Sequence, residues 1–249
     1  MIASINPVAK IAASALLALC LVLTIDPVSS GVALLLELPV FLALGIPART
    51  FWKRTLPVWI GAPLAALTIA LYGRTSGTVF AEFLFVRISE GSLEFALATL
   101  LRVLAIALPA VVLFITIDPT DLADGLAQVW HLPSRFVLGA LAGVRLIGLA
   151  LEDWRSITLA RRARGVGDSG AIRRFFGQAF ALLVLSIRRG STLATAMEAR
   201  GFGAPVVRTW ARESRWGARE WLAVVIGGTI GGAGIAASLI TGHWTPLVG

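Results

Sequence analysis

Residues 95–117, FALATLLRVLAIALPAVVLFITI, contain one charged side chain, Arg102, among 23 positions. A helix needs roughly 20 residues to cross a hydrocarbon layer of ~30 Å. Four further apolar runs of similar character extend over residues 8–25, 28–46, 57–72 and 221–240. Together the five runs predict an all-α, polytopic membrane protein with about five transmembrane helices.

The composition agrees with this class. Of the 249 residues, 57% are hydrophobic and 14% are charged, whereas soluble domains average about 45–50% apolar and about 25% charged residues. The run at 8–25 resembles a signal peptide, but a second apolar run follows directly after the turn DPVSS, so we interpret it as the first span. Cys20 is the only cysteine, forms no internal disulfide, and is expected to be a packing residue.

Most of the net charge belongs to one stretch. Residues 152–220 carry thirteen of the 22 Lys and Arg residues and six of the 14 Asp and Glu residues, a net charge of +7. Basic segments next to spans stay in the cytoplasm. We therefore expect transmembrane helices 1–4 in residues 1–117, a cytoplasmic region in residues 118–215, and a final transmembrane helix with an outer tail in residues 216–249. This topology places the N-terminus in the cytoplasm.

Three arginines fit this topology poorly. Arg74 and Arg87 fall on the outer side, and the segment SGTVFAEFLFV between them is expected to be interfacial or re-entrant. Arg102 lies within an apolar run, where a charge at the bilayer centre costs about 2.5–3.5 kcal/mol on insertion scales. Its side chain must therefore face protein or water, or lie near an interface.

The cytoplasmic region contains two long helical patterns. The first runs from LPSRF to RARG with Pro133 in its first turn, and the second runs from AIRRFF to MEARG. Only their middle parts, residues 136–151 and 175–187, are apolar, and Arg145 interrupts the first of them. We expect both helices to lie along a membrane surface or against a partner rather than to cross the bilayer.

The same triplet ends both helical patterns. Ala163-Arg164-Gly165 and Ala199-Arg200-Gly201 are separated by 36 residues. A glycine just beyond the end of a helix readily adopts the left-handed conformation of a C-terminal cap. An arginine in the last turn is stabilised by the negative end of the helix dipole. A single such ending is an ordinary helix stop. The pair, however, suggests two guanidinium groups presented to carboxylates of another protein.

Catalytic and metal-binding motifs are weak. Asp118, Asp121 and Asp124 share roughly one helix face, which fits either a Mg²⁺-binding cluster or, as we prefer, favourable charges at a helix N-terminus. The sequence contains no G-x-x-x-x-G-K-[ST] phosphate loop. The two histidines, His131 and His243, fall on opposite sides of the predicted membrane topology. No metal site or cofactor is predicted in this chain.

The paired triplets resemble the signature of the transmembrane T component of energy-coupling factor (ECF) transporters, the EcfT/CbiQ-type family. The opening NPVAKI and the segment IDPTDLADGLAQVWHLPSRF are also similar to this family. The resemblance implies two crossing cytoplasmic coupling helices whose tips dock into two ATPase subunits. It further implies that Ala163, Arg164, Gly165, Ala199, Arg200 and Gly201 form the docking sites.

The resemblance also implies the other partners. A small substrate-binding membrane subunit would pack on the apolar parts of the coupling helices and carry a vitamin or a transition-metal ion. ATP and Mg²⁺ would bind to the partner ATPases, so this chain would not be an enzyme, and no nucleic-acid partner is implied. The expected location is the inner membrane of a prokaryote. Two alternatives are a conventional permease that binds its own substrate and a membrane phosphotransferase that uses the aspartates.

Overall fold

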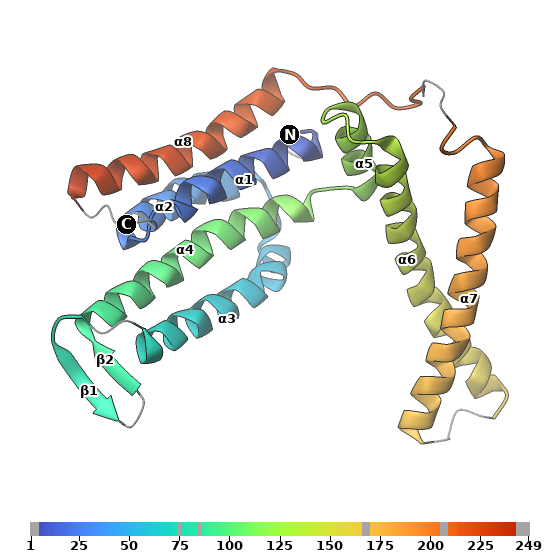
Figure 1. Cartoon of the computed structure of the whole chain (residues 1–249), viewed down its shortest axis with the longest axis horizontal. Helices are drawn as coiled ribbons and strands as arrows, with labels where there is room; N and C mark the ends of the chain where they lie inside the picture. The colour runs from blue at the N-terminus through green and yellow to red at the C-terminus, as the bar shows by residue number, and fades with distance from the viewer. Residues whose placement is uncertain (1–4, 74–75, 84–85, 166–169, 205–208, 243–249) are drawn as a thin grey trace. The chain divides into compact units, whose positions relative to one another are not determined.

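The computed structural model of the chain describes residues 5–73, 76–83, 86–165, 170–204 and 209–242. Within these residues it has eight helices and one two-stranded sheet (Figure 1). The chain forms two compact units, and we describe each by itself. The bundle unit consists of Met1–Asp118 and Arg215–Gly249, and the helix-pair unit consists of Pro119–Ser214. The predicted all-α polytopic class is confirmed.

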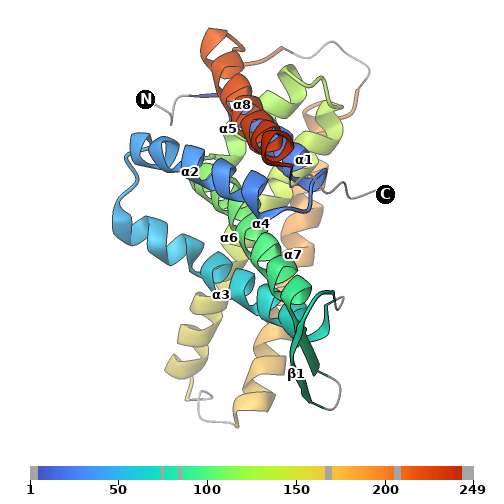
Figure 2. The same cartoon turned by 90° about the vertical axis from the view of Figure 1, so that its left-hand side faces the viewer.

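The bundle unit contains five helices: α1 (Pro7–Val22), α2 (Pro27–Ala43), α3 (Ala48–Tyr72), α4 (Glu90–Ile115) and α8 (Ala218–Thr241). Helix α8 lies along α1 (Figure 2). Helix α2 packs against both α4 and α8, and α3 packs against α4. One apolar cluster joins α1, α2, α4 and α8 and another joins α3 and α4. Their buried members are Leu17, Leu21, Ala33, Ala105 and Ile230, and Ala62, Leu104 and Leu108.

Five described helices are long and apolar enough to cross a membrane, as predicted, but they are not the five expected. They are α3, α4, α8 and the two long helices of the helix-pair unit, α6 (Ser134–Ala163) and α7 (Ala171–Ala199). The first two expected spans form the shorter helices α1 and α2, of 16 and 17 residues. Length and composition do not distinguish a helix that spans the membrane from a long amphipathic helix. Whether α6 and α7 are interpreted as membrane-spanning therefore depends on their charge.

Two further boundaries differ from the prediction. Helix α3 begins at Ala48 with Pro47 as its N-cap residue, and the stretch ARTFWKRT forms its first turns instead of a loop. Residues of the expected interfacial segment form a β-hairpin of β1 (Val79–Phe83) and β2 (Val86–Ser89), in which Phe83 pairs with Val86. The β-branched and aromatic residues of this segment favour strands. Arg74 lies outside the described residues.

Several polar groups are buried inside the bundle. The Lys10 ammonium, 2% exposed, donates to the backbone oxygen of Thr116 at 3.2 Å and to its hydroxyl at 2.9 Å. Asp26 caps α2 by accepting a hydrogen bond from the Ser29 backbone N–H at 2.8 Å. Arg102 is partly buried and interacts electrostatically with Asp26. It therefore faces protein, as the cost of a charge in hydrocarbon requires.

Helix α8 approaches its neighbours through glycines. A Cβ atom at Gly227 would lie 2.5 Å from the carbonyl oxygen of Ala13, and one at Gly234 would lie 2.7 Å from that of Ser29. Small residues allow such close packing of helix backbones within membranes, where interhelical contacts stabilise the bundle. A Cβ at Gly232, in contrast, would meet nothing within 4 Å.

We predict that Gly227→Ala destabilises the bundle, because the added methyl group displaces α8 from the backbone of α1. Overpacking of this kind costs typically about 1–3 kcal/mol. Thermal unfolding of the purified protein in detergent should show a lower melting temperature for Gly227→Ala. Gly232→Ala is the matched control and should melt at or above the wild-type temperature. Equal melting temperatures for the two variants would contradict the close contact.

Candidate functional site

The helix-pair unit consists of the short helix α5 (Pro119–Gln128), the long helices α6 and α7, and the segment that follows α7. Helix α5 anchors the start of α6 through Ala123, Ala127 and Val137, against which Trp210 packs. His131 in the intervening turn adopts a positive φ of 52°. The base of α6 is therefore held by apolar packing.

The segment after α7 is tied to α5 by polar contacts. The Gln128 amide nitrogen donates to the Arg212 backbone oxygen at 2.9 Å, and its amide oxygen accepts from the Ser214 backbone N–H at 2.8 Å. Arg212 also pairs with Asp121 at 3.1 Å. These contacts close the helix-pair unit at the end where α6 begins.

The first arginine triplet forms the C-terminal end of α6. Arg164 is the C-cap residue, and its backbone N–H bonds to the Ala160 oxygen at 3.2 Å. Gly165 has a φ of 70°, and its N–H bonds to the Arg162 oxygen at 3.0 Å. This is the left-handed glycine cap that the sequence predicted. Residues 166–169 of the connection to α7 lie outside the described residues.

The second triplet ends α7 in nearly the same conformation. Gly201 has a φ of 77°, and its N–H bonds to the Glu198 oxygen at 2.9 Å. The Phe202 N–H bonds back to the Met197 oxygen at 2.9 Å, which completes a Schellman motif. The C-cap dihedral angles are φ −92° and ψ 12° at Arg200, against φ −88° and ψ 5° at Arg164. The two helix tips therefore present their arginines on matching backbones.

Both arginine side chains are available for a partner. Arg164 and Arg200 are exposed, and among the residues that the structure describes neither guanidinium has a hydrogen-bond or ion-pair partner. Ala163 and Ala199 are exposed beside them and add little bulk. A planar guanidinium carries five N–H donors and binds a carboxylate through two parallel hydrogen bonds. Each tip is therefore suited to bind an acidic side chain of another protein.

The structure does not bring the two triplets together. Helices α6 and α7 run in opposite directions (Figure 1), so the two tips lie at opposite ends of the helix pair. Helices of 30 and 29 residues are each about 45 Å long at ~1.5 Å per residue. An arrangement with two separated and similar tips fits two binding events, one at each tip, rather than one shared site.

Comparison with known proteins places the chain in a family. Residues 1–209, which include both triplets, match the model of the cobalt transport protein family CbiQ. The chain belongs to the CbiQ family. It is 28% identical over 236 residues to the energy-coupling factor transporter transmembrane protein EcfT of Bacillus selenitireducens, with 89% of this chain and 87% of the relative covered. The protein of the same name from Thermanaerovibrio acidaminovorans is 29% identical over 234 residues, with coverages of 89% and 86%.

The family assignment confirms the resemblance that the triplets suggested, and this CbiQ-family chain is a multi-pass membrane protein of a transport family. The Mg²⁺ interpretation of the aspartates finds no support in the geometry. Within the described ranges no three His, Cys, Asp or Glu side chains lie close enough to hold a metal ion. Asp121 instead pairs with Arg212.

Two features of the tips were not predicted from the sequence. One is the Schellman bond through Phe202, which depends on the residue after the triplet. The other is a groove of about 420 Å³ beside Arg200, lined by Leu138, Leu141, Ala142, Arg145, Leu146, Leu149, Leu193, Met197, Arg200 and Phe202. The leucine spacing along α6 could have indicated this groove, but only the position of α7 shows that Arg200 borders it. The second tip thus combines a cation with an apolar surface.

Proposed function

We propose that this CbiQ-family chain is the transmembrane T subunit of an ECF-type importer. In this role it links ATP hydrolysis by two cytoplasmic ATPase subunits to movement of a small substrate-binding membrane subunit. The observation that carries the proposal is a pair of exposed arginines on matching helix caps at opposite ends of the helix pair, neither of which has a partner among the described residues. The relatives named EcfT support the assignment to an ECF transporter.

The orientation follows from charge. The helix-pair unit, with the adjoining start of α8, contains most of the net positive charge of the chain, and basic residues stay on the cytoplasmic side of a membrane. We therefore assign the helix-pair unit to the cytoplasm, together with the N-terminus, and the bundle unit to the cell membrane of a prokaryote. The apolar middles of α6 and α7 then lie against the membrane or a membrane subunit instead of crossing the bilayer.

The two tips would hold the ATPases. Arg164 and Arg200 would each pair with acidic residues in a groove of one ATPase subunit. The small Ala163 and Ala199 would allow close approach, and the left-handed glycines would turn the chain away from the contact. ATP and Mg²⁺ would be bound and used in those subunits. When the ATPase pair closes, it would move both tips, and the helices would transmit this movement.

The substrate-binding subunit would occupy the apolar surface of the helix pair. Large apolar side chains on both helices are exposed there, each with 61–74% of its surface accessible, namely Phe136, Ile147, Leu151, Phe176, Phe180 and Ile187. Exposed apolar patches of this extent mark protein or membrane contacts. The cargo class would be a vitamin or a transition-metal ion, bound by that subunit and not by this chain.

Two other functions would make different demands. A conventional permease would bind its cargo alone, and a phosphotransferase would act on lipid alone. Affinity purification of the full chain from its native membrane in mild detergent distinguishes these possibilities. We expect two ATPase chains and one small hydrophobic subunit to co-purify. Recovery of this chain alone, with its own ligand binding or lipid turnover, would contradict the T-subunit assignment.

A further inference from the structure

An ion pair joins the two long helices of the helix-pair unit. The Arg189 guanidinium on α7 donates to both carboxylate oxygens of Asp153 on α6, at 2.5 Å and 3.0 Å. The side chains are 39% and 15% exposed, respectively. A bidentate contact of this kind is directional, because both N–H groups must stay aligned with the carboxylate. It therefore restricts the relative orientation of α6 and α7 as well as their separation.

The ion pair is placed symmetrically with respect to the two tips. Asp153 and Arg189 are 36 residues apart, which is also the interval between Arg164 and Arg200. Each member of the pair thus precedes the arginine of its own tip by the same eleven residues. Eleven residues correspond to about three helical turns and ~16 Å, so each tip lies on nearly the same helix face as its member of the ion pair.

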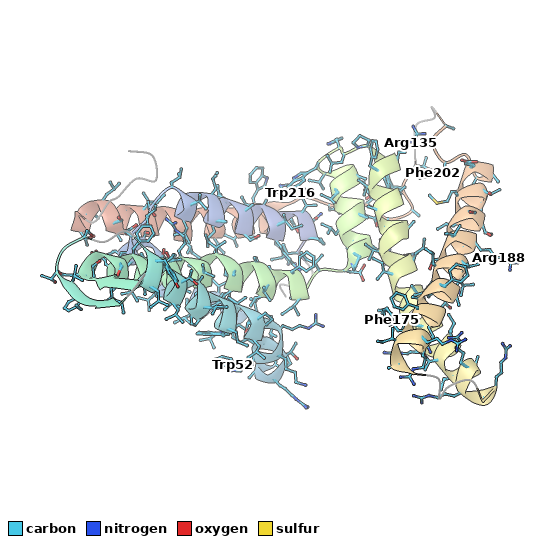
Figure 3. All side chains as sticks on the ribbon, turned by 60° about the horizontal axis from the view of Figure 1, so that its bottom comes forward. Trp52, Arg135, Phe175, Arg188, Phe202 and Trp216 are labelled. Carbon is cyan, nitrogen blue, oxygen red and sulfur yellow. The ribbon has the colours of Figure 1, made fainter. Side chains whose placement is uncertain are left out.

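A second contact between α6 and α7 lies on the side of the connecting segment. The rings of Trp154 and Phe175 are 5.6 Å apart between centroids, and Figure 3 shows Phe175 where α7 meets α6. The Arg161 guanidinium donates to the Arg174 backbone oxygen at 3.4 Å. A Cβ atom at Gly177 would lie 2.8 Å from Nη1 of Arg161, so the Arg161 guanidinium lies directly against the backbone of α7. The helices are thus closely packed here.

The ion pair and the Trp154–Phe175 contact together restrict the angle between α6 and α7 more than either contact alone. Packing at a single crossing fixes where two helices touch but leaves the angle between them adjustable. Asp153 and Trp154 are neighbours on α6, whereas Arg189 and Phe175 are 14 residues apart on α7, so the ion pair holds α7 at a second point and fixes this angle. On the other side of the ion pair, toward Arg200, Leu146 and Leu149 of α6 and Leu193 and Met197 of α7 line the groove of about 420 Å³, and Figure 1 shows the two helices farther apart there. The arm that carries Arg200 therefore diverges from α6 just beyond the ion pair.

We propose that Asp153 and Arg189 are positioning residues that set the angle between α6 and α7 and thereby the separation of the two arginine tips. This proposal rests on the proposed function, in which each tip holds one ATPase. With the ion pair intact, closure of the ATPases moves α6 and α7 as one body. Without it, the arm of α7 turns about the Trp154–Phe175 contact, and ATP hydrolysis is transmitted poorly to the substrate-binding subunit.

The experiment measures the separation of the tips directly. Spin labels are attached at Leu159→Cys and Thr195→Cys, two exposed positions near the tips, in a Cys20→Ser background that removes the only native cysteine of this chain. The chain is labelled before the complex is assembled. Electron–electron distance measurements on the purified full complex should give a narrow distribution with Asp153 and Arg189 in place. Asp153→Arg should broaden or shift it, and the exchange Asp153→Arg with Arg189→Asp should restore it.

Neighbouring residues provide matched controls. Glu152 and Arg188 are exposed, and Figure 3 shows Arg188 on the side of α7 that faces away from α6. Glu152→Arg and Arg188→Asp should leave the distance unchanged. In the reconstituted complex, Asp153→Arg should reduce uptake per ATP hydrolysed by about fivefold, an effect within the range for residues that couple sites, while the ATPases stay bound. The charge exchange should recover most of this ratio.

The outcomes separate this proposal from the function on which it rests. If no ATPase co-purifies with the wild-type chain, the proposed function fails, whatever the label distance. If ATPases co-purify but Asp153→Arg leaves the distance and the uptake per ATP unchanged, only the positioning role is overturned. Should Asp153→Arg fail to fold, Asp153→Asn and Arg189→Gln provide the same comparison with a smaller perturbation, and unchanged distances in both would overturn the positioning role.

Discussion

Charge reversal at either helix tip, by Arg164→Glu or Arg200→Glu, is expected to abolish transport by the assembled importer. In the proposed docking arrangement, each substitution replaces a cation that would face a partner carboxylate with an anion. Loss of one partner from a desolvated charge pair costs about 2–5 kcal/mol, and about 1.4 kcal/mol already corresponds to a tenfold change in binding. Uptake of the cargo found on the substrate-binding subunit is the measurement, and we expect a decrease of at least about tenfold.

The double variant Arg164→Glu with Arg200→Glu should additionally release both ATPases in a co-purification. Arg188→Glu is the matched control, because Arg188 is an exposed arginine of α7 away from the tip. It should retain wild-type uptake, and all variants should insert into the membrane normally. Wild-type uptake by either single reversal would show that the arginine of that tip has no role in docking.

Valine in place of either cap glycine, Gly165→Val or Gly201→Val, should also abolish transport. At φ values of 70° and 77° a β-branched residue is strained, and residues held in such regions cost about 1–3 kcal/mol each. The chain would relieve this strain by unwinding the last turn, which would displace the arginine next to it. Uptake and ATPase co-purification measure the effect.

Two controls test whether the backbone conformation is the cause. Asparagine tolerates left-handed dihedral angles, so Gly201→Asn should retain a large part of the transport activity. Gly190 lies within α7, where an added Cβ would meet nothing within 4 Å, and Gly190→Val should transport normally. If Gly201→Val transports as well as Gly201→Asn, the left-handed cap is not required for docking.

Local patterns predicted the helices and the tips well. The apolar runs identified α4 and α8 within a few residues, and the glycine after each arginine identified the ends of α6 and α7. These features are encoded by neighbouring residues, since a cap depends on the dihedral angles of one or two positions. The start of α3 and the β-hairpin were missed because propensity within short mixed segments is a weak signal.

Contacts between distant residues could not be predicted from the sequence. The pairing of Asp153 with Arg189 depends on how α6 and α7 cross, and each residue alone is one charge among many on a basic helix. The close approach of Gly227 to Ala13 likewise depends on the packing of α8 against α1. The two triplets lie far apart because α6 and α7 run in opposite directions. The predicted helix lengths alone indicated only part of this separation.

In the proposed importer, each helix tip contacts one ATPase subunit. A photo-crosslinking amino acid placed at Arg162 or at Glu198, each two residues before the arginine of its triplet and exposed, tests this claim directly in the purified complex. Leu19 of α1, which is 61% exposed, is the control position in the bundle. We predict ATPase adducts from both tip positions and none from position 19. A complex that retains its ATPases but forms no ATPase adduct from either tip would contradict the proposed docking sites.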